Sequence, residues 1–96
     1  MFPAEFHPEA SLEIAEAIQL SENHKEKVLF EAELDEAICV VRENPYICRD
    51  RDDHFKFNLS LLPFYLPYIL LGNSIFFLAF AHNSRRPGYW KDRLPN

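Results

Sequence analysis

Apolar and polar residues follow two periods along the chain, and each period predicts a different kind of element. Residues 2–7 are mostly apolar, which predicts a brief edge strand. Residues 8–21 begin with a proline and then repeat apolar side chains at helical spacing. Residues 25–42 repeat this spacing, and Pro45 closes the pattern because the residue before a proline avoids helical geometry. Two helices separated by a short break predict an antiparallel helical hairpin.

The apolar stripes of these two helices define one half of the expected core. We expect the acidic faces of both helices, with Glu13 and Glu16 on the first, to be solvated surface. Cys39 lies within the second helix, and we expect a buried thiol there. The stripes are Ala10, Ile14, Ala17 and Ile18 in the first helix, and Phe30, Leu34, Ala37, Ile38 and Val41 in the second.

No Asp, Glu, Lys or Arg occurs from Phe57 to Ser84. The nearly unbroken apolar run 59–81 is long enough for a membrane-spanning helix, which needs about 20 residues. However, Gly72-Asn73 lies in its middle, and this dipeptide between aromatic-rich runs is typical of a hairpin turn. We therefore predict two buried strands, 64–71 and 75–81, and no membrane span. Pro67 then requires an edge position or a bulge, because proline has no N–H to donate.

The element order is a short strand, two helices, three strands and a basic tail. It predicts an α+β fold, in which the N-terminal strand and the helical hairpin pack on a small, mainly antiparallel sheet of three to four strands. Ninety-six residues form one domain, 1–96, with a single core. Residues 46–54 are a charged loop, which we interpret as a solvated connection.

Charge is divided unevenly along the chain, whose formal net charge is −5. Residues 1–48 hold three Lys or Arg and eleven Asp or Glu, a net of −8; residues 49–96 hold seven and four, a net of +3. This balance argues against direct DNA binding by the chain alone. Two cysteines are too few for a disulfide framework, and residues 1–5 lack the features of a signal peptide. We therefore expect a reducing, cytoplasmic location.

Cations and aromatic rings concentrate in the segment that follows the last apolar run. Guanidinium groups bind phosphates or carboxylates through paired hydrogen bonds, and aromatic rings stack on bases or fill a partner's pocket. The alternative is a segment that folds back, with its tryptophan on the sheet and its arginines paired to acidic helix residues. The candidate target-binding residues are Arg85, Arg86, Tyr89, Trp90, Lys91 and Arg93.

Other chemistry-bearing residues give weaker signals. His82 can act as a general acid or base, although a structural hydrogen bond at the strand end is the interpretation we favour. Tyr65 and Tyr68 are predicted to pack with their hydroxyls near water. The remaining histidines and the cysteines lack metal-ligand spacing, and no glycine-rich phosphate loop or nucleophile motif occurs. We therefore expect neither a metal nor a cofactor.

Four stretches carry a resemblance to a known family. They are Phe6-His7-Pro8-Glu9-Ala10, Arg42-Glu43-Asn44-Pro45, Pro63-Phe64 with Tyr68 and Gly72-Asn73, and residues 78–82 with 85–94. The first resembles a strand-to-helix entry, the second the end of a second helix, and the third a Pro-aromatic strand with its hairpin. The sequence resembles the RelE/ParE family of type II toxin–antitoxin toxins, and the fourth stretch resembles the ParE-like terminus.

The resemblance implies a toxin that a cognate antitoxin protein neutralises. ParE-like members block DNA gyrase, and RelE-like members cut messenger RNA on the ribosome. Where the family commonly carries arginines, this sequence has residues 60–62 (Ser-Leu-Leu) and Ile69. A nuclease needs cations around the scissile phosphate, so the sequence favours a toxin that binds its target. The alternatives are a RelE-like endoribonuclease, with Lys56, His82, Arg85 and Tyr89 as catalytic candidates, and a decayed toxin without activity.

Overall fold

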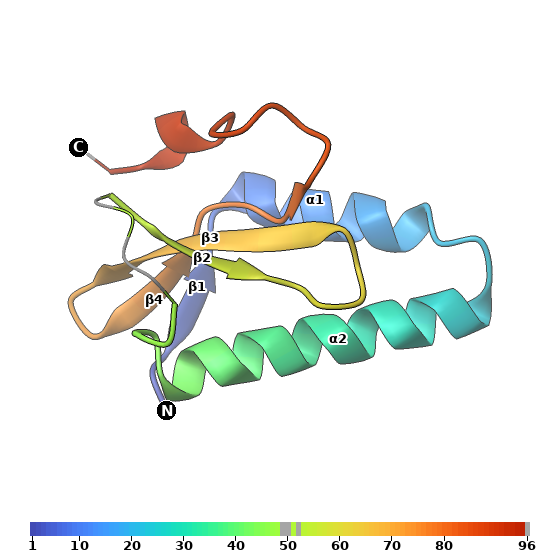
Figure 1. Cartoon of the computed structure of the whole chain (residues 1–96), viewed down its shortest axis with the longest axis horizontal. Coiled ribbons are helices and arrows are strands. Elements are labelled where there is room, and N and C mark those ends of the chain that lie inside the picture. Colours follow the sequence, from blue (N-terminus) through green and yellow to red (C-terminus); the bar gives the residue numbers. More distant parts are fainter. Residues whose placement is uncertain (49–50, 52, 96) are drawn as a thin grey trace.

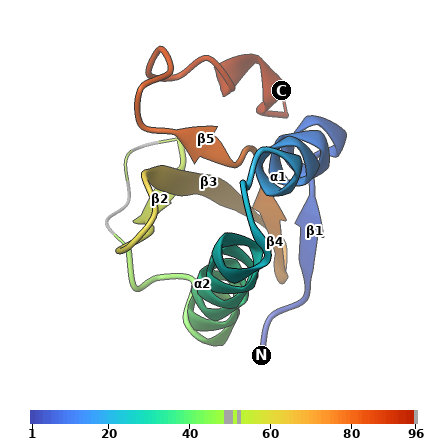
Figure 2. The ribbon, with the colours of Figure 1, turned by 90° about the vertical axis from the view of Figure 1, so that its right-hand side faces the viewer.

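The computed structural model describes residues 1–48, 51 and 53–95. Two helices lie against a sheet, and the C-terminal segment crosses the side of the sheet opposite α2 (Figures 1 and 2). A short 3₁₀ turn, Lys91–Arg93, follows the last strand. The elements are β1 (Ala4–Phe6), α1 (Pro8–Gln19), α2 (His24–Glu43), β2 (Phe55–Asn58), β3 (Phe64–Leu71), β4 (Ser74–Phe77) and β5 (Ala81–His82).

Both helices begin with a side chain that satisfies a free backbone N–H group. At α1, Nδ1 of His7 accepts from the N–H of Glu9 at 3.1 Å. At α2, the side-chain oxygen of Asn23 accepts from the N–H of Glu26, and the Glu26 carboxylate accepts in return from the N–H of Glu22. Such reciprocal bonds fix the start of a helix, so they explain why the chain breaks between α1 and α2 where the sequence predicts.

The sheet confirms the predicted α+β fold. Its order is β1–β4–β3–β2, with β1 parallel to β4 and the other neighbours antiparallel. The turn between β3 and β4 places Gly72 at φ 61°, which a glycine adopts without strain. Within residues 59–81, strands β3 and β4 are thus joined at Gly72-Asn73, and among the described residues no helix has the length and apolarity to cross a membrane.

A bulge accommodates Pro67 inside the sheet. Strand β4 ends at Phe77, earlier than predicted, and β5 takes its place beside the start of β3. Three residues, 78–80, therefore face two residues of β3, and the N–H of Leu78 donates to the carbonyl of Pro67 at 2.9 Å. The N and C=O groups of a strand residue point to the same side. The nitrogen of Pro67 thus faces the bulge, where no hydrogen bond is required.

Strand β3 is buried on both faces, which explains its unbroken apolar sequence. Leu66 and Tyr68 face the helices, where they join the predicted stripe of α2 and residues of β4 in one core cluster. Tyr65 faces the other way and joins a second cluster that contains Trp90. Helices cover one face and the C-terminal segment covers the other (Figure 2), so the sheet is the middle of three layers.

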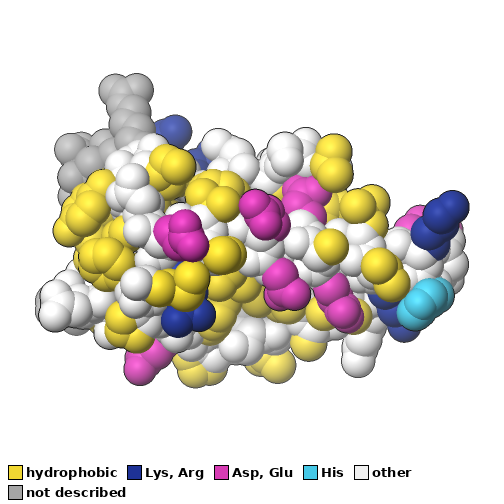
Figure 3. Space-filling view, turned by 90° about the horizontal axis from the view of Figure 1, so that it is seen from below, with side chains coloured by type: hydrophobic (Ala, Val, Ile, Leu, Met, Phe, Trp, Pro, Cys, Tyr) yellow, Lys and Arg dark blue, Asp and Glu magenta, His cyan; other side chains and the backbone are white. Residues whose placement is uncertain are grey.

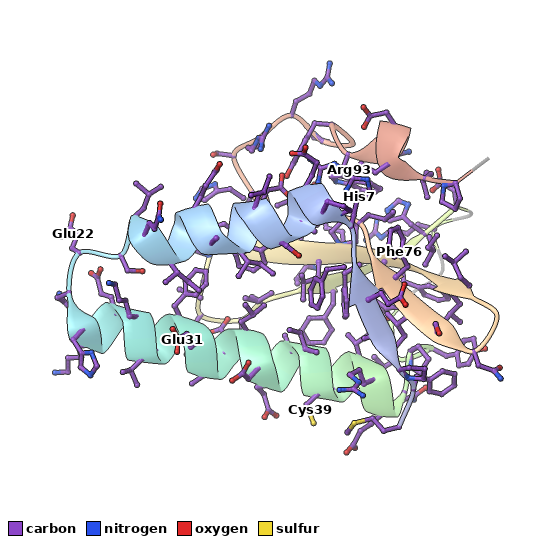
Figure 4. The ribbon with its side chains drawn as sticks, turned by 180° about the vertical axis from the view of Figure 1, so that it is seen from behind. His7, Glu22, Glu31, Cys39, Phe76 and Arg93 are labelled. Atoms are coloured by element: carbon purple, nitrogen blue, oxygen red, sulfur yellow. The ribbon has the colours of Figure 1, made fainter. Side chains whose placement is uncertain are left out.

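Three predictions about polar groups are wrong. Cys39 is exposed, and its side chain points away from the sheet (Figure 4), because its position on α2 lies just outside the buried stripe. The hydroxyl of Tyr68 is not near water but donates to the carbonyl of Pro45 at 2.7 Å within the core. The hydroxyl of Tyr65 accepts from the ring N–H of Trp90 at 3.0 Å, in a buried contact.

Candidate functional site

The C-terminal segment (residues 83–95) folds back onto the sheet. Gly88, at φ 76°, turns the chain so that the rings of Tyr89 and Trp90 reach the second apolar cluster. Trp90 is 2% exposed, and its ring lies edge-on to His54 at a centroid distance of 4.6 Å. The segment is therefore anchored by a large buried ring at its centre.

One carboxylate, that of Glu13 on α1, ties this segment to the helices. The guanidinium of Arg93 donates to it at 2.9 Å, Arg85 lies 3.4 Å from it, and the hydroxyl of Tyr89 donates to it. It also accepts from the N–H of Phe80 at 3.1 Å. Figure 4 shows Arg93 over the first turns of α1. We call this group, Glu13 with Arg85, Tyr89 and Arg93, the Glu13 clasp.

Burial and charge shift the proton affinities within the clasp. Burial, then the hydrogen bond and the negative charge of Glu13, raise the pKa of Tyr89 well above its ordinary value of 10.0. Burial alone would lower the pKa of Arg93, but the hydrogen bond and the charge of Glu13 raise it overall. The clasp therefore holds a neutral phenol and a charged guanidinium on one carboxylate.

The clasp separates the six predicted target-binding residues into two groups. Tyr89, Trp90 and Arg93 face inward and hold the segment in place. The other three, Arg85, Arg86 and Lys91, remain exposed; the side chain of Arg85 is 54% exposed while its guanidinium lies 3.8 Å from the Tyr89 ring centre. The structure thus presents three cations on a fixed backbone.

A cleft of about 330 Å³ lies between the C-terminal segment and β2 with its preceding loop. The ammonium of Lys56 lies 4.5 Å from the ring centre of Tyr65 on its floor. At the rim, Asp53 lies 2.6 Å from Nδ1 of His54 and 3.8 Å from Lys91. The hydrogen bond with His54 and the charge of Lys91 lower the pKa of Asp53. The lining residues are Arg51, His54, Lys56, Tyr65, Pro87, Gly88, Trp90 and Lys91.

The four catalytic candidates of the nuclease alternative do not share one site. Lys56 and Arg85 line a common hollow next to the cleft. His82 lines a different hollow, and its Nδ1 is bonded to the backbone N–H and the hydroxyl of Ser84. The hydroxyl of Tyr89 is held by the Glu13 carboxylate. Among the residues that the structure describes, no cluster of three or more His, Cys, Asp or Glu could hold a metal.

Sequence reasoning missed Glu13 and the loop residues that line the cleft, Arg51 and His54. Glu13 was placed among solvated carboxylates, yet it lies three residues after the buried Ala10 and one before Ile14. Its position at the border of the apolar stripe was the available signal. No sequence pattern points to Arg51 and His54, because only the fold brings their loop to the C-terminal segment.

Alkaline pH should test the two shielded phenols, since burial and, secondarily, contact with Cys48 also raise the pKa of Tyr68 above 10.0. Both phenols ionise more readily in the unfolded chain. Their contribution to stability is therefore complete below pH 10 and is lost as the pH rises above it. We expect the phenols of Tyr68 and Tyr89 to resist ionisation until the protein unfolds.

Tyrosinate absorbance recorded together with circular dichroism across this pH range checks the prediction. Tyr89→Phe should remove one late-titrating group. Ionisation of Tyr68 and Tyr89 near pH 10 in the folded protein would contradict it.

Comparison with solved structures identifies the fold. The chain is similar to a chain of the chromosomal ParDE toxin–antitoxin system from P. aeruginosa, with a TM-score of 0.71, 16% identity, and coverage of 85% of this chain and 96% of the other. It is also similar to a free double arginine-to-alanine mutant of the E. coli toxin RelE, with a TM-score of 0.67, 17% identity and coverage of 97% and 93%. The isolated E. coli RelE toxin is similar with a TM-score of 0.60 and 16% identity, and the match covers 96% of this chain and 95% of the other.

These neighbours are toxins of the RelE/ParE family, so the chain has the RelE/ParE toxin fold. No protein-family model and no curated protein matches the sequence. At this identity the likeness defines the architecture, and the function must be argued from the surface.

Proposed function

We propose that this chain is the toxin component of a type II toxin–antitoxin pair and acts by binding a cellular target. The resemblance of its C-terminal motif to ParE-like toxins implies DNA gyrase as that target and a cognate antitoxin as the partner that neutralises it. The observation that carries the proposal is the anchored C-terminal segment, which displays Arg85, Arg86 and Lys91 on the RelE/ParE fold.

Anchoring favours binding because it lowers the entropy lost when a partner docks. Trp90 and the Glu13 clasp fix the backbone on both sides of Arg86, so its guanidinium projects from an ordered turn. Exposed arginines on ordered backbone supply paired hydrogen bonds to carboxylates or phosphates of a target.

The cleft supports a second candidate, the RelE-like endoribonuclease. Lys56, Lys91 and Arg51 line it together with His54, and cations so placed stabilise a phosphate whose charge increases during cleavage. Two observations favour binding over cleavage: Tyr89 is held by Glu13, and His82 lines another hollow. Neither His82 nor Tyr89 is therefore placed for acid–base chemistry in the cleft, although Lys56 lines it.

The test combines induced expression in a bacterium with two assays of the purified protein. We expect growth arrest on induction and inhibition of gyrase supercoiling. The double variant Arg86→Ala/Lys91→Ala should raise the inhibitory concentration about tenfold, the loss of roughly 1.4 kcal/mol of binding free energy. Lys25→Ala/Lys27→Ala removes the same charge from the start of α2 and should leave inhibition unchanged.

The outcomes separate the candidates. Cleavage of translated messenger RNA in a reconstituted system, lost in Lys56→Ala, would replace the binding proposal with the endoribonuclease. Normal growth together with no effect in either assay would support the decayed toxin and contradict both.

A further inference from the structure

Strand β2 forms one edge of the sheet, opposite the edge formed by β1 (Figure 2). Its register with β3 places Lys56 opposite Pro67 and Asn58 opposite Tyr65. The carbonyl of Pro67 accepts from Leu78, so its main chain faces β4 and not β2. Because bonded and non-bonded pairs alternate in an antiparallel ladder, the N–H and C=O groups of Lys56 and Asn58 point outward. No other described residue bonds to these groups.

The side chains of β2 alternate between the two faces of the sheet. Phe57 faces the helices and packs, partly buried, against the main core cluster. Lys56 faces the C-terminal segment, where its ammonium lies over the ring of Tyr65. Asn58, two positions further, is exposed on the same face as Lys56. The edge therefore offers a half-buried ring on one face, and a cation beside an uncharged amide on the other.

An antiparallel second copy of β2 is complementary to this pattern. Pairing centred on Phe57 places Lys56 of one copy opposite Asn58 of the other, and each such pair exchanges both of its outward N–H···O bonds. The two Phe57 residues then face each other at the closer cross-strand spacing, about 4.5 Å between Cα atoms. No like charges lie directly opposite each other in this register.

The β1 edge lacks this complementarity. Its bonds with the β4 side use the carbonyl of Pro3 and the N–H of His7, so the main chains of Ala4 and Phe6 point outward. Antiparallel pairing of two β1 strands would centre on Glu5 and place two carboxylates directly opposite each other. Like charges in that position are destabilising.

The helical face also opposes a second copy. Residues 8–43 carry ten Asp or Glu and three Lys or Arg, a net of −7. Figure 3 shows carboxylates interspersed with apolar side chains along α2. Contact between two such faces would bring like charges together, so β2 is the edge that fits self-association.

Exposed apolar side chains at both ends of β2 enlarge the contact. Tyr46, 65% exposed, packs edge-on to Phe55 at the start of the strand. Leu61, 71% exposed, follows the end of the strand, and the carboxylate of Glu33 fixes it by accepting from its N–H at 2.8 Å. Antiparallel pairing runs the end of one β2 beside the start of the other. Leu61 of each copy therefore approaches Tyr46 and Phe55 of its neighbour, and this contact covers apolar surface.

We propose that two copies of the chain associate through their β2 edges, by antiparallel pairing centred on Phe57. Directly opposite side chains in such a pair lie on the same face, so both C-terminal segments lie on one side of the joined sheet. The dimer thus presents Arg86 twice, at symmetric positions. Because each copy uses its β2 edge in the same contact, the association closes at two copies. It does not require toxin activity.

Sedimentation velocity over a wide range of protein concentration measures the association. A reductant prevents disulfides through the exposed Cys39. We expect an equilibrium between monomer and dimer. Each copy carries a net charge of −5, so added salt should screen their repulsion and favour the dimer.

Charge variants test the register. Asn58→Lys places a second cation opposite Lys56 at both pairs and should weaken the dimer about tenfold, whereas Asn58→Asp should strengthen it about tenfold. Overall net charge alone would give the opposite order, because the lysine variant carries less negative charge. Asn73→Lys and Asn73→Asp make the same changes at the exposed β3–β4 turn and should leave the affinity unchanged.

Residue-resolved amide hydrogen exchange locates the contact without a substitution. The amides of Lys56 and Asn58 should exchange more slowly as the protein concentration rises, whereas those of Ala4 and Phe6 should not. A monomer at every concentration, a dimer that Asn58→Lys leaves unchanged or strengthens, or protection at Ala4 and Phe6 in place of β2 would each overturn the proposal.

Discussion

Replacing Glu13 with glutamine is expected to destabilise this protein by about 3 kcal/mol, a large part of the roughly 5 to 15 kcal/mol that stabilises a domain of this size. The side chain of Glu13 is 11% exposed and that of Arg93 is 13% exposed. Removing the negative charge leaves the nearly buried guanidinium of Arg93 without a counter-ion. An uncompensated buried charge accounts for most of the free energy lost when such a pair is broken. Urea denaturation followed by circular dichroism measures the change.

Glu16→Gln provides the matched control for this prediction. Glu16 is exposed on the same helix, and no hydrogen bond or ion pair of its side chain occurs among the described contacts. Its substitution should change stability by no more than about 0.5 kcal/mol. Equal effects of the two substitutions would show that Glu13 does not hold the C-terminal segment.

Replacing Trp90 with alanine is expected to cost about 4 kcal/mol, the usual range for removing a buried aromatic ring. The substitution empties the centre of the second apolar cluster and leaves the hydroxyl of Tyr65 without its donor. Trp90→Phe retains a ring and should cost far less. Thermal unfolding of the three proteins measures the difference.

Fluorescence of the single tryptophan reports the same layer directly. In the native protein its emission should be that of a buried indole, and Glu13→Gln should shift it toward the emission of an exposed one. A solvent-exposed emission from the unmodified protein would contradict the anchored segment.

Local patterns were sufficient to predict the helices and the hairpin. The stripe from Phe30 to Val41 is a helix pattern because each buried residue lies three or four positions from the next. Gly72-Asn73 marked its turn because few other dipeptides tolerate the required backbone angles. Pro67 required an edge position or a bulge, because its missing N–H is a property of the residue itself, and the structure has the bulge.

Contacts between distant residues could not be predicted in this way. Glu13 is 80 positions from Arg93 and 76 from Tyr89, so no spacing rule connects them. Strand β2 was not placed, because four residues between a charged loop and an apolar run carry too short an alternation. The sequence left two alternatives for the C-terminal segment, of which folding back was one. The segment folds back because strand β3 is apolar on both faces and its second face needs a covering layer.

The second covering layer of the sheet is synthesised after the helices and all the strands of the sheet. Until residues 89–94 leave the ribosome, one face of β3 has no partner, although the helices can already cover the other face. A nascent chain at this stage exposes apolar surface that invites aggregation. Any translation stop before Trp90 should therefore yield an insoluble fragment, so correct folding of the sheet depends on synthesis of the segment that covers its second face.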